Sequence, residues 1–163
     1  MDTYHTIISK RDTRAYTDKP VPEETLRRIL TAGRMAGSSK NGQPFRFVVL
    51  RDREKIRSLA ACGQFTGAMA AAPLVIAIIL RADGRPFDAG RAGQNMMIAA
   101  WTEGIASCPV AIQDEECGRK SLGLPADFAV AMVLTMGYPL PGSALSRGQR
   151  RLAMEEMVHW EGW

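Results

Sequence analysis

Hydrophobic and polar residues follow one another along the chain with two different periods, which predict both helices and strands. Residues 74–80 are apolar at every position, as in a central strand covered on both faces. Residues 87–103 place small and apolar side chains on one helical stripe, and Gly104 is suited to end that helix. Shorter apolar runs predict three more strands, at residues 47–50, 105–112 and 128–136.

Local signals place the ends of several of these elements. Asp2, Asp52 and Asp114 each precede a helical pattern, where a carboxylate can cap the first backbone N–H groups. Pro22 suits the first turn of a helix. Pro109 removes a backbone donor, so it marks the third strand as irregular or as an edge strand.

The order of the elements bears on the fold class. The chain opens with two helices, then alternates helices with a few strands, and contains no repeat or low-complexity linker. This order favours an α+β fold, a three-layer α/β/α sandwich around a mixed sheet, over a regular doubly wound fold. A length of 163 residues suits a single domain, residues 1–163, with a real core.

Composition and charge exclude several classes of protein. A content of 46% hydrophobic and 23% charged residues is typical of a globular chain. The net charge of +4 weakly favours anionic ligands, but no basic run is interleaved with aromatics, so we expect no nucleic-acid partner. The longest apolar run is far shorter than the roughly 20 residues that cross a bilayer. The N-terminus lacks a secretory signal, so we expect a cytoplasmic protein with no membrane partner.

The spacing of cysteines and histidines argues against disulfides and metal sites. Cys62, Cys108 and Cys117 are odd in number and lack Cys-x-x-Cys spacing, which predicts reduced thiols. His5 and His159 have no second ligand at metal-binding spacing, so no metal is expected. No Ser-His-Asp or Cys-His pairing can be proposed from spacing either, and we assign no catalytic residue.

Two polar segments are the candidates for chemistry. The basic segment, residues 10–14, and the polar loop, residues 36–44, together suit a phosphorylated, planar cofactor with polar edges. Each also has a plainer interpretation, because cations at a helix end complement the dipole and Gly, Ser and Asn are ordinary in turns. The loop lacks P-loop spacing, and no Gly-x-Gly-x-x-Gly follows a strand, so an ATPase or a Rossmann dehydrogenase is not expected.

Five motifs follow one another along nearly the whole chain: Lys10-Arg-Asp-Thr-Arg with a downstream Pro-Val, Ser38-Ser-Lys-Asn-Gly-Gln-Pro-Phe, Asp88-Ala-Gly-Arg-Ala-Gly-Gln-Asn with Glu103-Gly-Ile-Ala-Ser-Cys, Met136-Gly-Tyr-Pro, and Arg151-Leu-Ala-Met-Glu-Glu-Met-Val-His-Trp. Each is weak alone, but in this order they resemble the nitroreductase family of flavin enzymes. The resemblance implies that family's three-layer fold, with a mainly antiparallel sheet.

The resemblance implies a flavin mononucleotide (FMN) site built first from the basic segment. Lys10, Arg11 and Asp12 would contact the flavin phosphate, ribityl chain or ring edge, and Arg14 closes the same motif. Lys10 stands where the family usually has Arg, so a point charge replaces a bidentate fork.

The polar loop would serve the second half of the site. By resemblance, Met35, Ser38, Ser39 and Asn41 would reach the flavin of a partner subunit, and Gln43 would support the loop. The sequence departs from the family here, with glycine where proline is usual and phenylalanine where tryptophan is usual.

The end of the chain would complete the site. Arg151, with Arg150, would return to the flavin phosphate according to the same resemblance. The chain is short for the family, and the helices that usually cover the substrate side are reduced.

The implied activity is an FMN-dependent oxidoreductase that passes hydride equivalents from NADPH or NADH to a small electron-poor acceptor such as a nitroaromatic or a quinone. FAD is expected to bind poorly, because no dinucleotide fingerprint is present. Two alternatives stay open. One is a flavin-binding protein of this fold without turnover, and the other is a specialised flavin enzyme of the dimethylbenzimidazole synthase or dehalogenase type.

A homodimer with FMN at the subunit interface is the expected assembly. The stripe Gly90, Gly93, Gln94, Met97 and Trp101 combines small residues for close approach with large ones for anchoring. From the residues alone, the stripe suits the core face of an internal helix equally well. The resemblance favours the dimer, because relatives build each site from both chains.

Overall fold

The computed structural model describes residues 2–143 and 151–163. Its central layer is a sheet with strand order β1-β2-β4-β3. The strands are β1 (Phe45–Leu50), β2 (Leu74–Arg81), β3 (Ala106–Val110) and β4 (Phe128–Gly137). Each neighbouring pair is antiparallel, and one parallel bridge joins Asp12 to Ser107 at the β3 edge. The expected mixed, mainly antiparallel sheet is confirmed.

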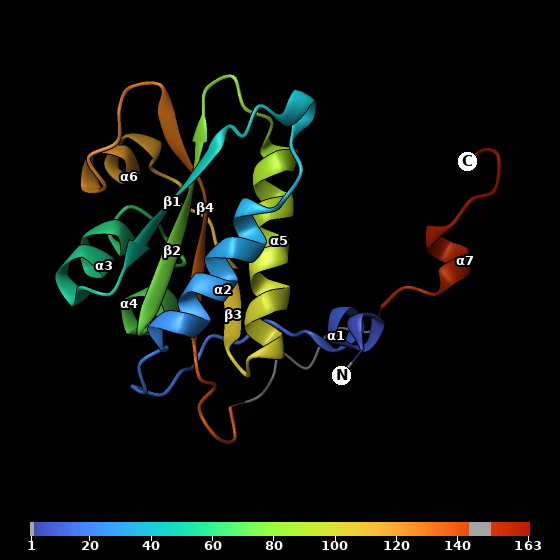
Figure 1. The fold of residues 1–163 in the computed structure, drawn as a ribbon, viewed down its shortest axis with the longest axis horizontal. Coiled ribbons are helices and arrows are strands. Elements are labelled where there is room, and N and C mark those ends of the chain that lie inside the picture. Colours follow the sequence, from blue (N-terminus) through green and yellow to red (C-terminus); the bar gives the residue numbers. More distant parts are fainter. Residues whose placement is uncertain (1, 144–150) are drawn as a thin grey trace.

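Helices cover both faces of this sheet, which gives the three-layer sandwich expected from the sequence (Figure 1). One face packs against α2 (Glu23–Arg34) and α5 (Pro86–Thr102). The other packs against α3 (Arg53–Ala60), α4 (Gly67–Ala71) and α6 (Glu115–Ser121). The remaining helical segments are α1 (Thr3–Ser9), the 3₁₀ turn η1 (Ser39–Asn41) and α7 (Met154–Met157).

The central strand β2 separates two hydrophobic cores. Leu74, Ile76 and Ile78 are buried on the side of α2 and α5. Their neighbours Val75 and Ile79 are buried on the opposite side, against α3 and α4. Because successive strand residues point to opposite faces, only a run that is apolar at every position can fill both cores.

Helix α2 packs close to α5 because a glycine lies at their contact. A Cβ at Gly33 would come within 2.7 Å of Met96 Cγ, so any larger residue would force the helices apart. The predicted caps are also present. Asp2, Asp52 and Asp114 each accept a backbone N–H in the first turn of their helix. Pro109 lies on β3, at the edge of the sheet, as expected.

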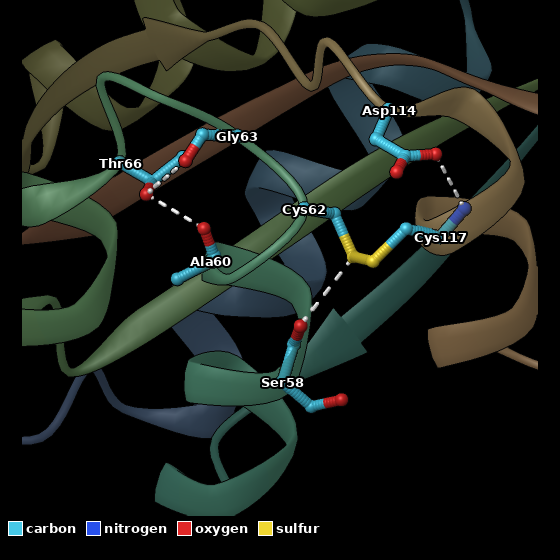
Figure 2. The surroundings of a disulfide bond; sticks show 7 residues. All are labelled: Ser58, Ala60, Cys62, Gly63, Thr66, Asp114 and Cys117. Carbon is cyan, nitrogen blue, oxygen red and sulfur yellow. Dashed lines mark hydrogen bonds between the residues drawn. A yellow bond between two sulfur atoms is a disulfide. The ribbon is translucent and has the colours of Figure 1, made fainter.

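The prediction of three reduced thiols is wrong for two of the cysteines. Cys62, just after α3, forms a disulfide with Cys117 in α6, with a Cα–Cα distance of 5.4 Å (Figure 2). The two cysteines are 55 residues apart, so no local spacing announces the pair. Packing of α6 against α3 brings them together. Cys108 is free and buried.

The stripe on α5 lies partly inside the core and partly on the surface. Gly93 and Met97 are buried, Trp101 is half-buried, and Gly90 and Gln94 are exposed. The alternative that the whole stripe is a core face is therefore wrong, because the core face takes in only Gly93 and Met97 of the stripe and otherwise consists of neighbouring positions such as Ala89, Ala92, Met96 and Ala100. Within the described ranges, none of the helices is long and apolar enough to cross a bilayer.

Candidate functional site

The basic segment lies along the free edge of β3. The Thr13 N–H donates to the Ser107 carbonyl at 3.1 Å, which fixes the backbone between Lys10 and Arg14. The Lys10 side chain is only 8% exposed, and its ammonium donates to Asp12 Oδ1 and to Met97 Sδ on α5, the latter at 3.4 Å. The structure therefore brings Lys10 and Asp12 together as a pair against α5.

The two arginines of this segment are placed differently. Arg11 donates from Nη1 to the carbonyls of Ile8 and Lys10, at 2.7 and 2.9 Å, and so caps the end of α1. Arg14 is exposed. A guanidinium carries five N–H donors, so Arg11 keeps donors for a ligand while one nitrogen holds the helix end.

Beneath the basic segment lies a group of buried polar side chains. The Tyr16 phenol and Thr135 Oγ1 share a hydrogen bond of 2.7 Å, and burial raises the pKa of Tyr16. Burial also raises the pKa of the Cys108 thiol. The hydroxyls of Thr13 and Ser107 are buried without a hydrogen-bond partner among the residues described, as are those of Thr17, Ser121 and Ser143. What sets Thr13 and Ser107 apart is their place beside the Lys10–Asp12 pair, where a ligand can supply the missing hydrogen bonds.

The polar loop is held in a strained conformation. Lys40, Asn41 and Gln43 have φ values of 51°, 53° and 45°, in the left-handed region that residues with a side chain rarely adopt. Asparagine tolerates this region, but for Lys40 and Gln43 it costs roughly 1–2 kcal/mol each. The Gln43 N–H donates to Ser38 Oγ at 2.9 Å, and Arg46 donates to the Gln43 carbonyl at 2.9 Å. Strain of this kind persists only where surrounding contacts hold it, and it clusters at ligand sites.

Two residues of α5 tie the loop to the body of the protein. The Ser39 N–H donates to Asp88 Oδ2 at 3.2 Å. The Arg91 guanidinium lies against Gly37, where a Cβ would come within 2.7 Å of Arg91 Nη2. Sequence reasoning missed Asp88 as a site residue, because an acid in a first helical turn is expected for the dipole alone.

Within one chain, the loop and the basic segment do not meet. The loop contacts the start of α5 through Asp88, whereas the basic segment contacts Met97, nine positions further on. At 1.5 Å per residue these contacts are about 14 Å apart along the helix. Figure 1 shows the loop near one end of α5 and α1 near the other.

The remaining predicted site residues that the structure describes are exposed. Met35 ends α2 and is 68% exposed, and Asn41 is exposed in the loop. Arg151 is exposed at the start of the C-terminal segment, residues 151–163, which includes α7 and lies beyond α1 and away from the sheet (Figure 1). Arg150 falls outside the described residues.

The arrangement of these elements is shared with a known family. The family model described as the nitroreductase family matches residues 7–72 and 65–138, which together span most of the chain and both candidate segments. This chain belongs to the nitroreductase family.

Relatives of the family match the chain from end to end. A protein from Archaeoglobus fulgidus described as an NADH dehydrogenase/NAD(P)H nitroreductase is 28% identical, over 96% of this chain and 96% of its own. A solved structure with the same description, from Parabacteroides distasonis, has a TM-score of 0.89 at 25% identity and covers 99% of this chain and 98% of that one. A structure from Desulfovibrio desulfuricans, described as a nitroreductase in complex with FMN, has a TM-score of 0.88 at 26% identity, covering 100% and 99%.

Proposed function

We propose that this nitroreductase-family protein is an FMN-dependent oxidoreductase that moves hydride equivalents from NADPH or NADH to a small electron-poor acceptor. The observation that carries the proposal is the Lys10–Asp12 ion pair, which lies at the family's basic motif with the Lys10 side chain only 8% exposed. The relative from Desulfovibrio desulfuricans, described as a complex with FMN, supports the choice of cofactor.

The donors near Lys10 suit this cofactor. A lysine ammonium has three N–H donors, and one of those on Lys10 meets only a thioether sulfur, a weak acceptor. The unpartnered hydroxyl of Thr13 lies in the basic segment, and that of Ser107 lies on β3, at the residue that bridges to Asp12. FMN presents a phosphate, hydroxyls and ring carbonyls, which match this mixture of cations and hydroxyls.

The protein's own part in the reaction is binding and orientation. When bound, the flavin accepts and passes on hydride, and this chemistry needs no acid or base from the chain. Lys10 would place a positive charge at the flavin's polar edge, where it favours negative charge on the ring. Asp12 would hold that ammonium in place and accept from ring or ribityl donors.

A homodimer is the assembly we propose, with the flavin between subunits. The separation of the polar loop from the basic segment along α5 supports it, because a second copy can supply the missing loop. The exposed Gly90 and Gln94 offer a face on α5 that leaves room for a close two-fold contact.

The C-terminal segment supports the same assembly. Five of its apolar side chains are 61–104% exposed, namely Leu152, Met154, Met157, Trp160 and Trp163. A groove of about 630 Å³ lies between α2 and the edge strand β1, lined by Arg27, Leu30, Thr31, Arg34, Gln43, Phe45, Arg46, Phe47 and Val49. The acidic and apolar residues of the segment complement the arginines and apolar floor of this groove. We infer that the groove receives the segment of the partner subunit.

Two observations on the purified protein test the proposed activity. A yellow protein that releases FMN, and not FAD, on denaturation supports flavin binding. Bleaching of that colour by NADPH or NADH, followed by return of the colour on adding a quinone or nitroaromatic, supports turnover. A yellow protein that neither reductant bleaches favours the alternative of a flavin-binding protein without turnover, and a colourless protein that takes up no added FMN contradicts the proposal.

The cytoplasmic location stays a prediction. Disulfides are rare in reducing compartments, so the Cys62–Cys117 pair makes the prediction testable. Mass spectrometry of protein alkylated directly in lysed cells would report whether these two thiols are free.

A further inference from the structure

Asp88 is an unusual residue for its position. Among residues 2–143 and 151–163 it is the only aspartate, glutamate, lysine or arginine that is buried as a whole residue, with 3% exposure, although the Lys10 side chain is also largely covered. It lies in the first turn of α5, where the helix dipole favours a negative charge. Exposed acids at other helix starts gain the same benefit without losing their hydration, so the dipole does not explain the burial.

The hydrogen bond that Asp88 accepts explains its burial better than the helix dipole does. Oδ2 of Asp88 accepts the Ser39 N–H at 3.2 Å, at the start of the 3₁₀ turn in the polar loop. The next two residues, Lys40 and Asn41, have left-handed backbone angles. The Gln43 N–H to Ser38 Oγ hydrogen bond lies within the loop, whereas the bond to Asp88 ties the loop to a helix.

Helix α5 also holds the other half of the candidate site. Met97 contacts the Lys10 ammonium, and the Trp101 indole N–H donates to Ser9 Oγ at 3.1 Å. One rigid helix therefore sets the position of the basic segment and, through Asp88, that of the polar loop. A change at either contact would alter the geometry between them.

We propose that Asp88 is a positioning residue for the flavin site, whose buried carboxylate holds the polar loop in its strained, binding-competent conformation. This rests on the proposed function, because the loop matters only if it meets a flavin. Asp88 itself touches neither cofactor nor substrate in this role. It acts through the backbone of Ser39.

Hydrogen–deuterium exchange on the full chain tests the contact without relying on catalysis. Asp88→Ala removes the acceptor, Asp88→Asn keeps an oxygen acceptor but removes the charge, and Asp127→Asn changes an exposed carboxylate as the matched control. After removal of FMN, we expect peptides covering residues 38–43 to exchange roughly 10- to 100-fold faster in Asp88→Ala, because the bond to a charged acceptor is lost. Asp88→Asn should give a smaller increase, and Asp127→Asn none.

Affinity for added FMN provides the second measurement. We expect FMN to bind most weakly to Asp88→Ala, less weakly to Asp88→Asn, and normally to Asp127→Asn. The midpoint of thermal unfolding should change little or rise in Asp88→Asn, because a desolvated charge is removed. A general structural role would instead lower stability and affinity together. If Asp88→Ala does not fold, the comparison of Asp88→Asn with Asp127→Asn still tests the proposal.

The two proposals fail in different ways. Loop exchange in both Asp88 variants equal to that of Asp127→Asn would overturn the positioning role, whatever the flavin does. If loop exchange is faster in the Asp88 variants but neither they nor the parent protein take up FMN, the contact between Asp88 and the loop is supported. Its role in flavin binding is then overturned, together with the proposed function.

Discussion

The two faces of the sheet differ in what holds them and in what they hold. On one face, α2 and α5 meet at Gly33, and α5 supports both candidate segments through Asp88 and Met97. On the other face, a disulfide joins the end of α3 to α6, and none of the predicted site residues lies on these helices. Both layers bury a hydrophobic core, but the α2–α5 layer also contacts the two candidate segments, whereas the opposite layer carries the disulfide. Substitutions on the two faces should therefore separate stability from flavin binding.

The largest effect is expected on the site face, at the proposed dimer contact. Trp101→Glu places a charge on the half-buried end of the α5 stripe, and it should give a folded monomer that has lost its flavin. Sedimentation velocity and the flavin absorbance of the same sample measure both. Thr102→Glu, at an exposed neighbour, is the control. A monodisperse monomer that carries stoichiometric FMN would defeat the interface assignment.

A substitution on the opposite face should change the free energy of unfolding strongly and leave FMN affinity unchanged. Cys117→Ser opens a loop closed across 55 residues, which should lower the free energy of unfolding by about 4 kcal/mol. Urea titration measures the change, and added dithiothreitol should have no further effect on this variant. FMN affinity should stay near that of the parent protein. An equal loss of affinity would show that the two faces are coupled.

Removing an arginine from the basic segment should weaken FMN binding, whereas removing one from the opposite face of the sheet should not. Arg11→Ala removes donors from the basic segment and should release FMN from a protein that stays folded, since charge-assisted bonds to a phosphate are lost. The matched change is Arg119→Ala in α6, where the guanidinium pairs with Glu116 at 2.7 Å. Equilibrium dialysis with FMN compares the two. Full flavin occupancy in Arg11→Ala would leave this arginine only as the cap of α1.

Replacing a lysine with glycine should change the free energy of unfolding in opposite directions in the polar loop and in α3. Lys40→Gly relieves a left-handed residue and should raise the free energy of unfolding by roughly 1 kcal/mol. Lys55→Gly, inside α3, should lower it by about the same amount because glycine disfavours helices. Chemical denaturation of both variants checks the pair. Destabilisation by Lys40→Gly would mean that the loop is not strained in solution.

The smallest effect is a pH dependence from the cap of α3. Hydrogen bonds from the backbone N–H groups of Lys55 and Glu54 hold the pKa of Asp52 below its ordinary value of 3.8. The folded pKa lies below the unfolded one, so this stabilisation is present above 3.8 and is lost as the pH falls through the folded pKa. Urea midpoints measured from neutral to acid pH should fall less in Asp52→Asn than in the parent. Identical acid profiles would contradict the assignment.

The sequence by itself determined the elements whose signals are local. The run at 74–80 became β2, because a short apolar run rich in β-branched residues suits a strand covered on both faces. Asp2, Asp52 and Asp114 cap their helices because capping needs only the residue and the first turn that follows it. The basic segment and the polar loop were likewise recognisable, since their residues stand in an order typical of one family.

Tertiary structure alone decided how distant residues meet. The disulfide of Cys62 and Cys117, the burial of Lys10 against Met97, and the contact of Asp88 with Ser39 each join segments far apart in the chain. No spacing rule reaches across such distances, because the contacts arise from the packing of helices on a shared sheet. For the same reason, sequence periodicity left two interpretations of the α5 stripe open, and packing decided which of its positions are buried. Which neighbours cover a helix is settled only when the layers assemble.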